Sequence, residues 1–261
     1  MRFDVLAQGF GLAEGPAWDG EGLLFADAIF GGIKRIGPDG RVSEVIQKRR
    51  GVGGIVVHAD GGFVMSGRDV LHVHPDGEQV VLLDKQPGFA GFNDMGTLGD
   101  GAVIVGALRF NPVQGETPQP GAIVTLRPGD DHQDTTELPL VTWPNGIACA
   151  EDGETFYLAD FDTGEIWRDA HEAWARSPTH DADGLAVDAE GGVWVALGGG
   201  GSIGRFVEGE VERTVEIPGA DFVSSLCFGG EDLRDLYVTA RSAVLRGRCD
   251  VAGLPVPPAR V

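Results

Sequence analysis

Residues 142–160 read TWPNGIACAEDGETFYLAD. The second half is typical of a strand, a turn and another strand, because an Asp-Gly turn precedes β-branched and aromatic residues. In the first half, Pro144 favours an extended residue before it, and Gly146 permits unusual backbone angles. The amide of Asn145 lies between them, directly before an apolar run. This arrangement predicts that Asn145 occupies a turn or faces a ligand.

The same pattern, a Gly/Asp turn followed by two short apolar strands, recurs along the chain. Six copies begin at residues 19, 60, 100, 152, 190 and 231, so successive copies lie 41, 40, 52, 38 and 41 residues apart. An all-strand repeat of about 40 residues is typical of a four-stranded propeller blade. We therefore predict an all-β fold, a single six-bladed β-propeller domain over residues 1–261, with four-stranded blades around a central channel.

Three segments depart from the regular repeat. The long third spacing predicts an inserted loop over residues 109–119. Residues 169–176 are expected to form at most a short helical turn within a loop. Because the last copy ends early, residues 3–6 are expected to complete a blade with C-terminal strands, which would leave no exposed sheet edge.

The charge of the chain limits its partners. With 40 acidic and 20 basic residues, the formal net charge is −20. Nucleic acids and anionic membranes both require a cationic face, so neither is expected as a partner. The bulk of this charge is interpreted as a soluble, self-repelling surface. We expect a monomer or a weak homodimer that binds a small molecule.

Neither the N-terminus nor any apolar run resembles a targeting or membrane-spanning segment. The three cysteines have no metal-ligand spacing, and their odd number argues against a disulfide framework. These observations predict a cytoplasmic protein.

Polar residues precede or begin the innermost strand in four of the six copies. Glu14, Asn93, Asn145 and Asp183 are each followed closely by small residues and an apolar strand. In a propeller these positions line the mouth of the channel, so two carboxylates and two amides would converge there. Oxygen ligands suit Ca²⁺, Mg²⁺ or Mn²⁺, while Zn²⁺ and Fe²⁺ stay open as alternatives.

Other polar residues compete for this role. Asp181 and Asp188 flank Asp183, and Asp188 is interpreted as a turn residue. His72 and His74 alternate along one strand, and because their hairpin lies far from the channel we expect surface histidines. His180 is close enough in sequence to reach the mouth.

Four motifs in register resemble the gluconolactonase/regucalcin family, and the resemblance covers nearly the whole chain. They are Glu-Gly-Pro-x-Trp from residue 14, Asn-Asp from 93, Pro-Asn-Gly from 144 and Asp-Gly-x-x-Val-Asp from 183. Residues 226–239 also resemble that family's last blade. The resemblance implies a six-bladed propeller with one divalent cation in the channel. By matching position, it implies that Glu14, Asn145 and Asp183 are the metal ligands.

The resemblance also implies an activity. The protein would be a divalent-metal-dependent hydrolase that opens a lactone ring, with a sugar lactone as the favoured substrate and Ca²⁺ as the favoured cation. Asp183 would act as general base, taking a proton as water attacks a carbonyl polarised by the metal. Asn93 would contact a metal-bound water or the substrate.

One position departs from the family pattern. Gly91 stands where the family usually has an arginine that holds sugar oxygens. Phe89, Phe92 and Trp143 lie nearby and predict a more apolar mouth, with Trp143 against the substrate. Arg109, in the inserted loop, is a candidate replacement for the missing cation. Alternative functions are therefore hydrolysis of another ester or of a phosphotriester, and a non-catalytic propeller that binds a metal or a protein partner.

Overall fold

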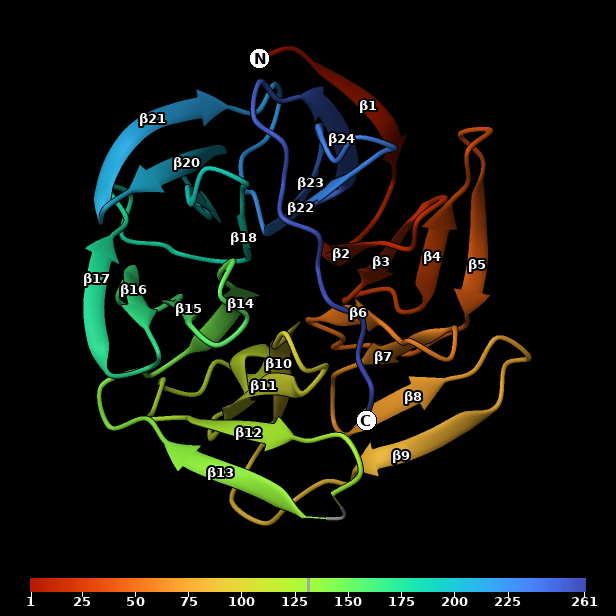
Figure 1. The fold of residues 1–261 in the computed structure, drawn as a ribbon, viewed down its shortest axis with the longest axis vertical. Coiled ribbons are helices and arrows are strands. Elements are labelled where there is room, and N and C mark those ends of the chain that lie inside the picture. The colour runs from red at the N-terminus through yellow and green to blue at the C-terminus, as the bar shows by residue number, and fades with distance from the viewer. Residues whose placement is uncertain (131) are drawn as a thin grey trace.

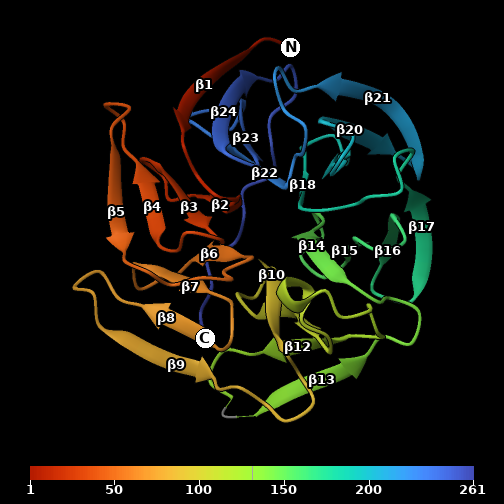
Figure 2. The same cartoon turned by 180° about the vertical axis from the view of Figure 1, so that it is seen from behind.

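Residues 1–130 and 132–261 are described by the computed structural model. Across these residues, six four-stranded antiparallel sheets are arranged as blades around a central channel (Figure 1, and from behind in Figure 2). The predicted six-bladed β-propeller is confirmed. No helix among the described residues is long and apolar enough to cross a membrane.

Each blade runs from an inner strand at the channel to an outer strand at the rim. The inner strands are β2 (Ala13–Trp18), β6 (Ile55–Val57), β10 (Gly91–Thr97), β14 (Pro144–Cys149), β18 (Leu185–Val187) and β22 (Ser225–Gly229). The second strands are β3 (Leu23–Asp27), β7 (Phe63–Met65), β11 (Val103–Leu108), β15 (Phe156–Asp160), β19 (Val193–Ala196) and β23 (Asp235–Ala240). The third strands are β4 (Ile33–Ile36), β8 (Val70–Val73), β12 (Ala122–Leu126), β16 (Glu165–Arg168), β20 (Ser202–Val207) and β24 (Ala243–Arg248). The outer strands are β5 (Val42–Ile46), β9 (Gln79–Leu83), β13 (Gln133–Glu137), β17 (Glu172–Arg176), β21 (Glu210–Glu216) and β1 (Phe3–Gln8).

The core lies between neighbouring blades. Second strands are buried on both faces, and all six residues of β11 are buried, which explains its continuous apolar sequence. Outer strands have one solvated face or are fully exposed, so β13 can be the polar sequence QDTTE. We number the blades 1 to 6 from β2, and we call the end of the channel where the inner strands begin the entry end.

The ring closes through the last blade. β1 pairs with β24, with Phe3 opposite Gly247 and Val5 opposite Leu245, as predicted for residues 3–6. At the channel the Ser224 hydroxyl of blade 6 donates to the Ala13 carbonyl of blade 1 at 2.6 Å. The ring is therefore closed by strand pairing at the rim and by a hydrogen bond beside the channel.

We expect Ser224→Ala to lower the free energy of unfolding by about 1–2 kcal/mol, because the Ala13 carbonyl would lose a buried partner. Urea unfolding measures this change. Ser43→Ala is the matched control, since the Ser43 hydroxyl makes only an exposed 3.4 Å contact with the Arg35 carbonyl. Equal stability losses in the two variants would contradict a role of Ser224 in closure.

The C-terminal segment crosses the end of the channel opposite the entry end (Figure 1). Leu254 N–H donates to the Val187 carbonyl of blade 5, and Ala259 N–H donates to the Val57 carbonyl of blade 2. Between these anchors, the Thr97 hydroxyl of blade 3 donates to the Pro257 carbonyl at 2.6 Å. The segment therefore links three blades across the axis.

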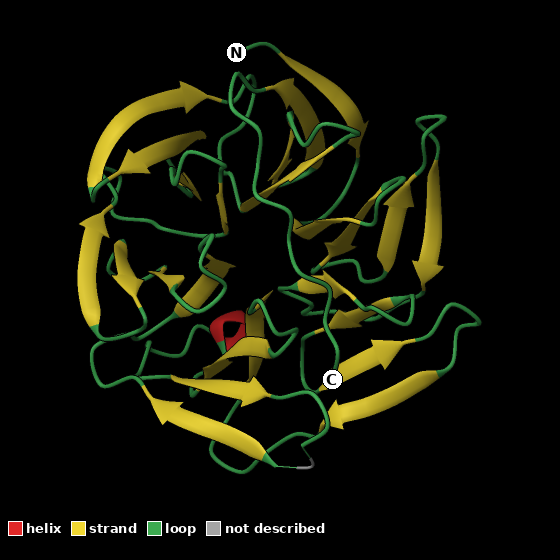
Figure 3. Ribbon diagram, in the orientation of Figure 1, coloured by secondary structure: helices red, strands yellow, loops and turns green. Residues whose placement is uncertain are grey.

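One local prediction was wrong. Residues 172–176, expected within a loop with at most a helical turn, form the outer strand β17, which pairs with β16. The chain reverses through Asp169 and Ala170, whose φ angles of 50° and 60° are positive. Pairing with β16 therefore overrides the weak local preference of this segment. The predicted inserted loop after β11 is confirmed, and it carries a short 3₁₀ helix, Pro112–Gln114 (Figure 3).

Candidate functional site

The inner strands of blades 1, 3 and 4 share an irregularity near the entry end. In β14, Asn145 and Gly146 together lie opposite the single residue Ala159 of β15. The same two-against-one step occurs at residues 15–16 of β2 and 93–94 of β10. Such a bulge interrupts the ladder and redirects side chains. This explains why Asn, Asp, Pro and Gly lie within otherwise apolar strands.

Glycines let neighbouring blades meet at these bulges. A Cβ added to Gly146 would lie 2.6 Å from the Leu185 nitrogen and closer still to the Asp183 carbonyl oxygen. A Cβ on Gly54 would lie 2.6 Å from the Met95 nitrogen. Only glycine allows this approach of backbone to backbone. Asn145 and Asp183, on different blades, are thereby brought to one place.

Three carboxylates gather at the channel from blades 1, 3 and 5. Burial raises the pKa of Asp94 to about 7, although the Met95 N–H donates to its carboxylate at 2.7 Å. Burial, and then repulsion from Asp94, raises the pKa of Glu14 well above its usual value. Burial also raises the pKa of Asp183, with smaller contributions from Glu14 and Asp94. These acids therefore share one region of low polarity.

The Asp183 side chain lacks a partner that its burial requires. It is 3% exposed, and its Oδ1 atom is buried with no hydrogen-bond partner in the described part of the chain. A buried carboxylate oxygen without a partner is costly. Asp183 therefore points at a place where a positive charge or a donor would be bound strongly.

Asp94 is a functional candidate that the motif alone did not single out. The sequence placed Asn93 at the site, whereas the bulge carries both residues of the Asn-Asp pair to the channel. The signal was the pairing of two polar residues within an apolar strand. The pair alone does not show that Asp94 faces the channel, because its direction depends on the bulge at residues 93–94.

The two amides differ in their contacts. Asn145 is 9% exposed on β14. Asn93 Nδ2 donates to the Pro144 carbonyl at 3.0 Å, so it ties blade 3 to the segment that carries Asn145. Asn93 thus helps to position the Pro144–Asn145 segment. A contact between Asn93 and substrate stays a prediction.

The donor set fits a hard divalent cation. Glu14, Asn145 and Asp183 come from three blades and offer carboxylate and amide oxygens, the ligands that Ca²⁺ and Mg²⁺ prefer. Within residues 1–130 and 132–261, no group of three or more His, Cys, Asp or Glu is arranged to hold a metal. A cation here would therefore depend on the Asn145 amide and on water in addition to the two carboxylates.

An aromatic row, which we define as Phe110, Trp143, Phe161 and Phe222, lies on loops at the entry end. Ring centroids are 4.9 Å apart for Phe110 and Trp143, 4.8 Å for Trp143 and Phe161, and 6.1 Å for Phe161 and Phe222. The Asp160 carboxylate accepts the Trp143 N–H at 2.9 Å and so holds this loop. The row includes Trp143, two residues before Asn145. The other two aromatic residues predicted for the mouth are not part of it, because Phe89 and Phe92 are buried in the core between blades 2 and 3.

Arg109 is already engaged by other side chains. Its guanidinium donates to both oxygens of Glu137, at 2.6 and 2.7 Å, and lies 4.8 Å from the centroid of the Phe89 ring. At Gly91, an added Cβ would lie 3.2 Å from the Gly67 carbonyl oxygen of blade 2. The neighbouring backbone thus crowds the position where an arginine was expected, and substrate binding by Arg109 stays a prediction.

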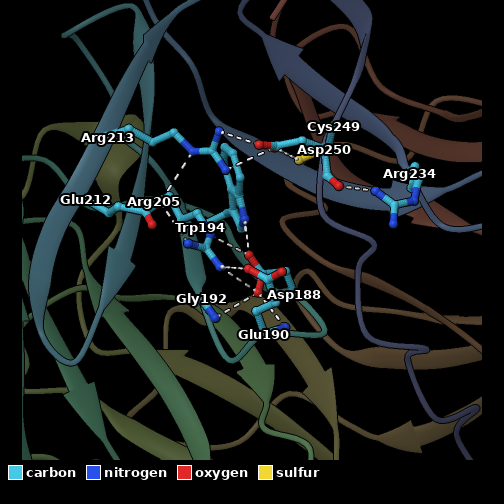
Figure 4. Close-up of polar contacts among 10 residues, drawn as sticks. All are labelled: Asp188, Glu190, Gly192, Trp194, Arg205, Glu212, Arg213, Arg234, Cys249 and Asp250. Atoms are coloured by element: carbon cyan, nitrogen blue, oxygen red, sulfur yellow. Dashed lines mark hydrogen bonds and ion pairs between the residues drawn. The ribbon is translucent and has the colours of Figure 1, made fainter.

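The two acids that flank Asp183 have structural partners. Asp181 accepts the Gly199 N–H at 2.9 Å. Asp188 is fully buried and accepts from the Arg205 guanidinium at 2.6 Å and from the Trp194 indole at 2.8 Å (Figure 4). Burial alone would raise the pKa of Asp188, but these two donors lower it below its usual value. Asp188 also caps a turn, as predicted. Within the described part of the chain, Asp183 is therefore the one acid of the three with a buried oxygen that lacks a hydrogen-bond partner.

The histidines lie outside the carboxylate cluster. His180 is exposed, with a φ of 67°. The prediction of a surface position was wrong for His72, which is 4% exposed and stacks between His58 and His74. The inner residue His58 contributes to this stack, and the hairpin pattern alone did not reveal it.

Comparisons with known proteins show the family of the chain. The model of the SMP-30/gluconolactonase/LRE-like region matches residues 12–242. Regucalcin of Xenopus laevis is 27% identical over 258 residues, which cover 90% of this chain and 85% of the relative. A pentonolactonase of Haloferax volcanii is 27% identical over 246 residues, which cover 87% of this chain and 81% of the relative.

Solved structures with the same fold include two bacterial proteins. A gluconolactonase of Xanthomonas campestris superposes with a TM-score of 0.82 at 21% identity, over 97% of this chain and 89% of its own. A calcium-binding protein, regucalcin, of Agrobacterium tumefaciens superposes with a TM-score of 0.83 at 22% identity, over 98% of this chain and 97% of its own. At these identities the likeness shows the fold.

Proposed function

The chain belongs to the SMP-30/gluconolactonase/LRE-like family, and from this membership and the channel geometry we propose that it is a metal-dependent lactonase. The observation that carries the proposal is the buried Asp183 oxygen without a partner, close to two further carboxylates. Such a cluster is destabilising without a cation. Relatives named for opening pentonolactones and gluconolactones support the reaction class.

The ligand set in this proposal is Glu14, Asn145 and Asp183. Bound there, a divalent cation would polarise a carbonyl and lower the pKa of a nearby water. Ca²⁺ is the favoured ion because the ligands are oxygens and a structural relative is described as calcium-binding. Mg²⁺, Mn²⁺, Zn²⁺ and Fe²⁺ are the alternatives to be compared with it.

The chain's own residues perform the remaining work. Asp183 accepts the proton of the attacking water and returns a proton to the leaving ring oxygen. Asn93 fixes the Pro144 carbonyl and thereby the Asn145 segment, so the donors keep their positions during turnover. The half-buried ring of Trp143 offers an apolar surface to one face of the substrate ring.

A sugar lactone is the favoured substrate, supported by the names of the relatives. Its ring has a less polar face that can lie on Trp143, while its hydroxyl groups face the carboxylates. The position of Gly91 implies that recognition of these hydroxyl groups does not rely on an arginine from β10. We therefore expect wider tolerance among lactones than an arginine-bearing site would have.

The deciding experiment is lactone hydrolysis by metal-stripped protein, with each of the five divalent cations added back singly. A panel of sugar and non-sugar lactones serves as substrates, and acid release is followed by the fall in pH. Restored turnover with one cation would support the proposal and identify the metal. Cation binding without turnover on any lactone would refute it.

That second result would favour a non-catalytic binding propeller. The specific observation behind this alternative is the pairing of Arg109 with Glu137, together with Gly91, which leaves the mouth without an arginine from these positions. Calorimetry with Ca²⁺ alone would measure the binding that both functions share.

We expect Glu14→Gln to weaken Ca²⁺ binding by about tenfold or more, because one carboxylate ligand loses its charge. Calorimetric titration measures the change. Glu44→Gln, on the outer strand β5, is the matched control, since its carboxylate lies 3.7 Å from Lys34 at the rim. Unchanged Ca²⁺ affinity in Glu14→Gln would exclude Glu14 as a ligand.

A further inference from the structure

A cavity occupies the channel behind the carboxylate cluster of Glu14, Asp94 and Asp183. It has a volume of about 610 Å³, and all six inner strands contribute to its wall. Its lining begins at Gly15, directly after Glu14, and at Asp94, which it shares with the carboxylate cluster. The cavity therefore lies on the far side of the cluster from the entry end.

The C-terminal segment forms the floor of this cavity. Leu254 through Pro258 line it, and three of these five residues are proline. The segment is anchored at both sides, by Leu254 on Val187 and by Ala259 on Val57. Prolines fix backbone angles, so this stretch spans the channel as a stiff strap that does not collapse into it.

Small side chains keep the cavity open. Ala148 of β14 and Ala186 of β18 line it and are only half-buried, although both belong to inner strands at the centre of the ring. Protein interiors normally pack to high density, and an unfilled space lowers stability. Larger apolar residues at these two positions would reduce the space. With Ala148 and Ala186 in place, the volume stays free for a ligand.

The chemistry of the lining selects the occupant. Apolar side chains such as Ile55, Leu226 and Phe228 dominate the wall, and none of the described residues that line it is Lys, Arg or His. The acids present are Asp94, Glu151 and Asp19, and Asp19 is paired with Arg35. Anions are therefore excluded by charge, and strongly hydrated molecules by the apolar wall.

We propose that this cavity is a second ligand site, on the side of the carboxylate cluster away from the entry end, for an uncharged and largely apolar molecule. Its volume suits a ligand of roughly twenty non-hydrogen atoms, within the usual range for pockets that bind small molecules. The site lies beyond the metal-dependent chemistry proposed above and does not depend on it.

The test uses the uncharged dye phenylnaphthylamine, whose fluorescence rises in apolar surroundings, with chelator present and no lactone. We expect saturable binding of one dye per chain, with Kd on the order of micromolar. Trp18 lines the cavity, so energy transfer to the dye is expected to fall in Trp18→Phe. Ala148→Phe is expected to raise Kd at least about tenfold by filling the space.

Controls separate this site from other apolar surfaces. Val81→Phe adds bulk on the exposed face of β9, where Val81 is 55% exposed, and should leave Kd unchanged. Trp143→Ala removes the ring that joins Phe110 to Phe161 in the aromatic row and should also leave Kd unchanged. If Ala148→Phe does not fold, Ala186→Leu provides the same test on another blade. The inference is overturned by the absence of saturable binding, or by binding that Trp143→Ala abolishes and both cavity-filling variants retain.

Discussion

Asp183→Asn is expected to reduce lactone turnover by about a thousandfold or more, because the variant loses both a charged metal ligand and the proposed general base. Folding should be retained. The buried Oδ1 of Asp183 has no hydrogen-bond partner, and the carboxylate is repelled by Glu14 and Asp94. Removing its charge therefore removes a repulsion that destabilises the metal-free protein. Steady-state kcat with saturating cation, together with thermal unfolding, measures both effects.

The matched control is Asp181→Asn. This acid lies two residues away, is of the same type, and accepts the Gly199 N–H. An amide oxygen can accept the same hydrogen bond, so activity should stay within about threefold of wild type. Full activity in Asp183→Asn, or an equal loss in both variants, would remove Asp183 from its catalytic role.

The metal-free protein is expected to lose stability as the pH rises from about 5 to about 8. An ordinary aspartate has a pKa of about 4, whereas burial raises the pKa of Asp94 to about 7. Between these values the folded protein holds more protons than the unfolded chain, so the free energy of unfolding falls as the pH increases. Asp94 alone would contribute a loss on the order of 3 kcal/mol. The raised pKa values of Glu14 and Asp183 act in the same direction.

Urea unfolding in chelator, at several pH values, measures this dependence. Asp94→Asn is the comparison variant, since it removes one titrating group and should flatten the curve. Saturating Ca²⁺ should raise the free energy of unfolding at the upper pH by about 3 kcal/mol at a hundredfold excess over Kd. A metal-free curve that is level or rises over this interval would contradict the clustering of the three buried acids.

The ring itself could be predicted from the sequence because its cause is local and repeated. Each Asp-Gly or Gly-Gly turn fixes one hairpin, and the spacing of the copies sets the number of blades. Closure by residues 3–6 followed from the missing strand in the last copy. These features depend on short-range chemistry, which a single sequence displays.

The arrangement within the channel could be predicted only in part. Polar residues at the start of apolar strands marked Glu14, Asn145 and Asp183, and the structure brings their segments together. The bulges that bring Asp94 into this cluster arise from pairing between strands, so they have no signature in one strand alone. The burial of His72 likewise depends on His58, a residue from a neighbouring strand pair that the hairpin pattern does not include.

The weak secondary-structure preference of residues 172–176 explains why the sequence did not predict the outer strand β17. Residues 172–176 contain Ala, Glu and Arg, which favour a helix when taken alone. The unpaired edge of β16 imposes a strand on them, because an exposed ladder of backbone groups gains a partner. Long-range pairing thus decides where local chemistry is ambiguous.

The pairing of β1 with β24 has a consequence for the order of events during synthesis. Phe3 leaves the ribosome long before its partner Gly247, which follows 247 − 3 = 244 residues later. Blade 6 therefore cannot assemble while translation proceeds, and β1 must wait without its partner. Such distant contacts slow folding, since a long loop must close before any pairing energy is gained. Nascent chains of this protein would thus depend on protection of that first strand until the last one emerges.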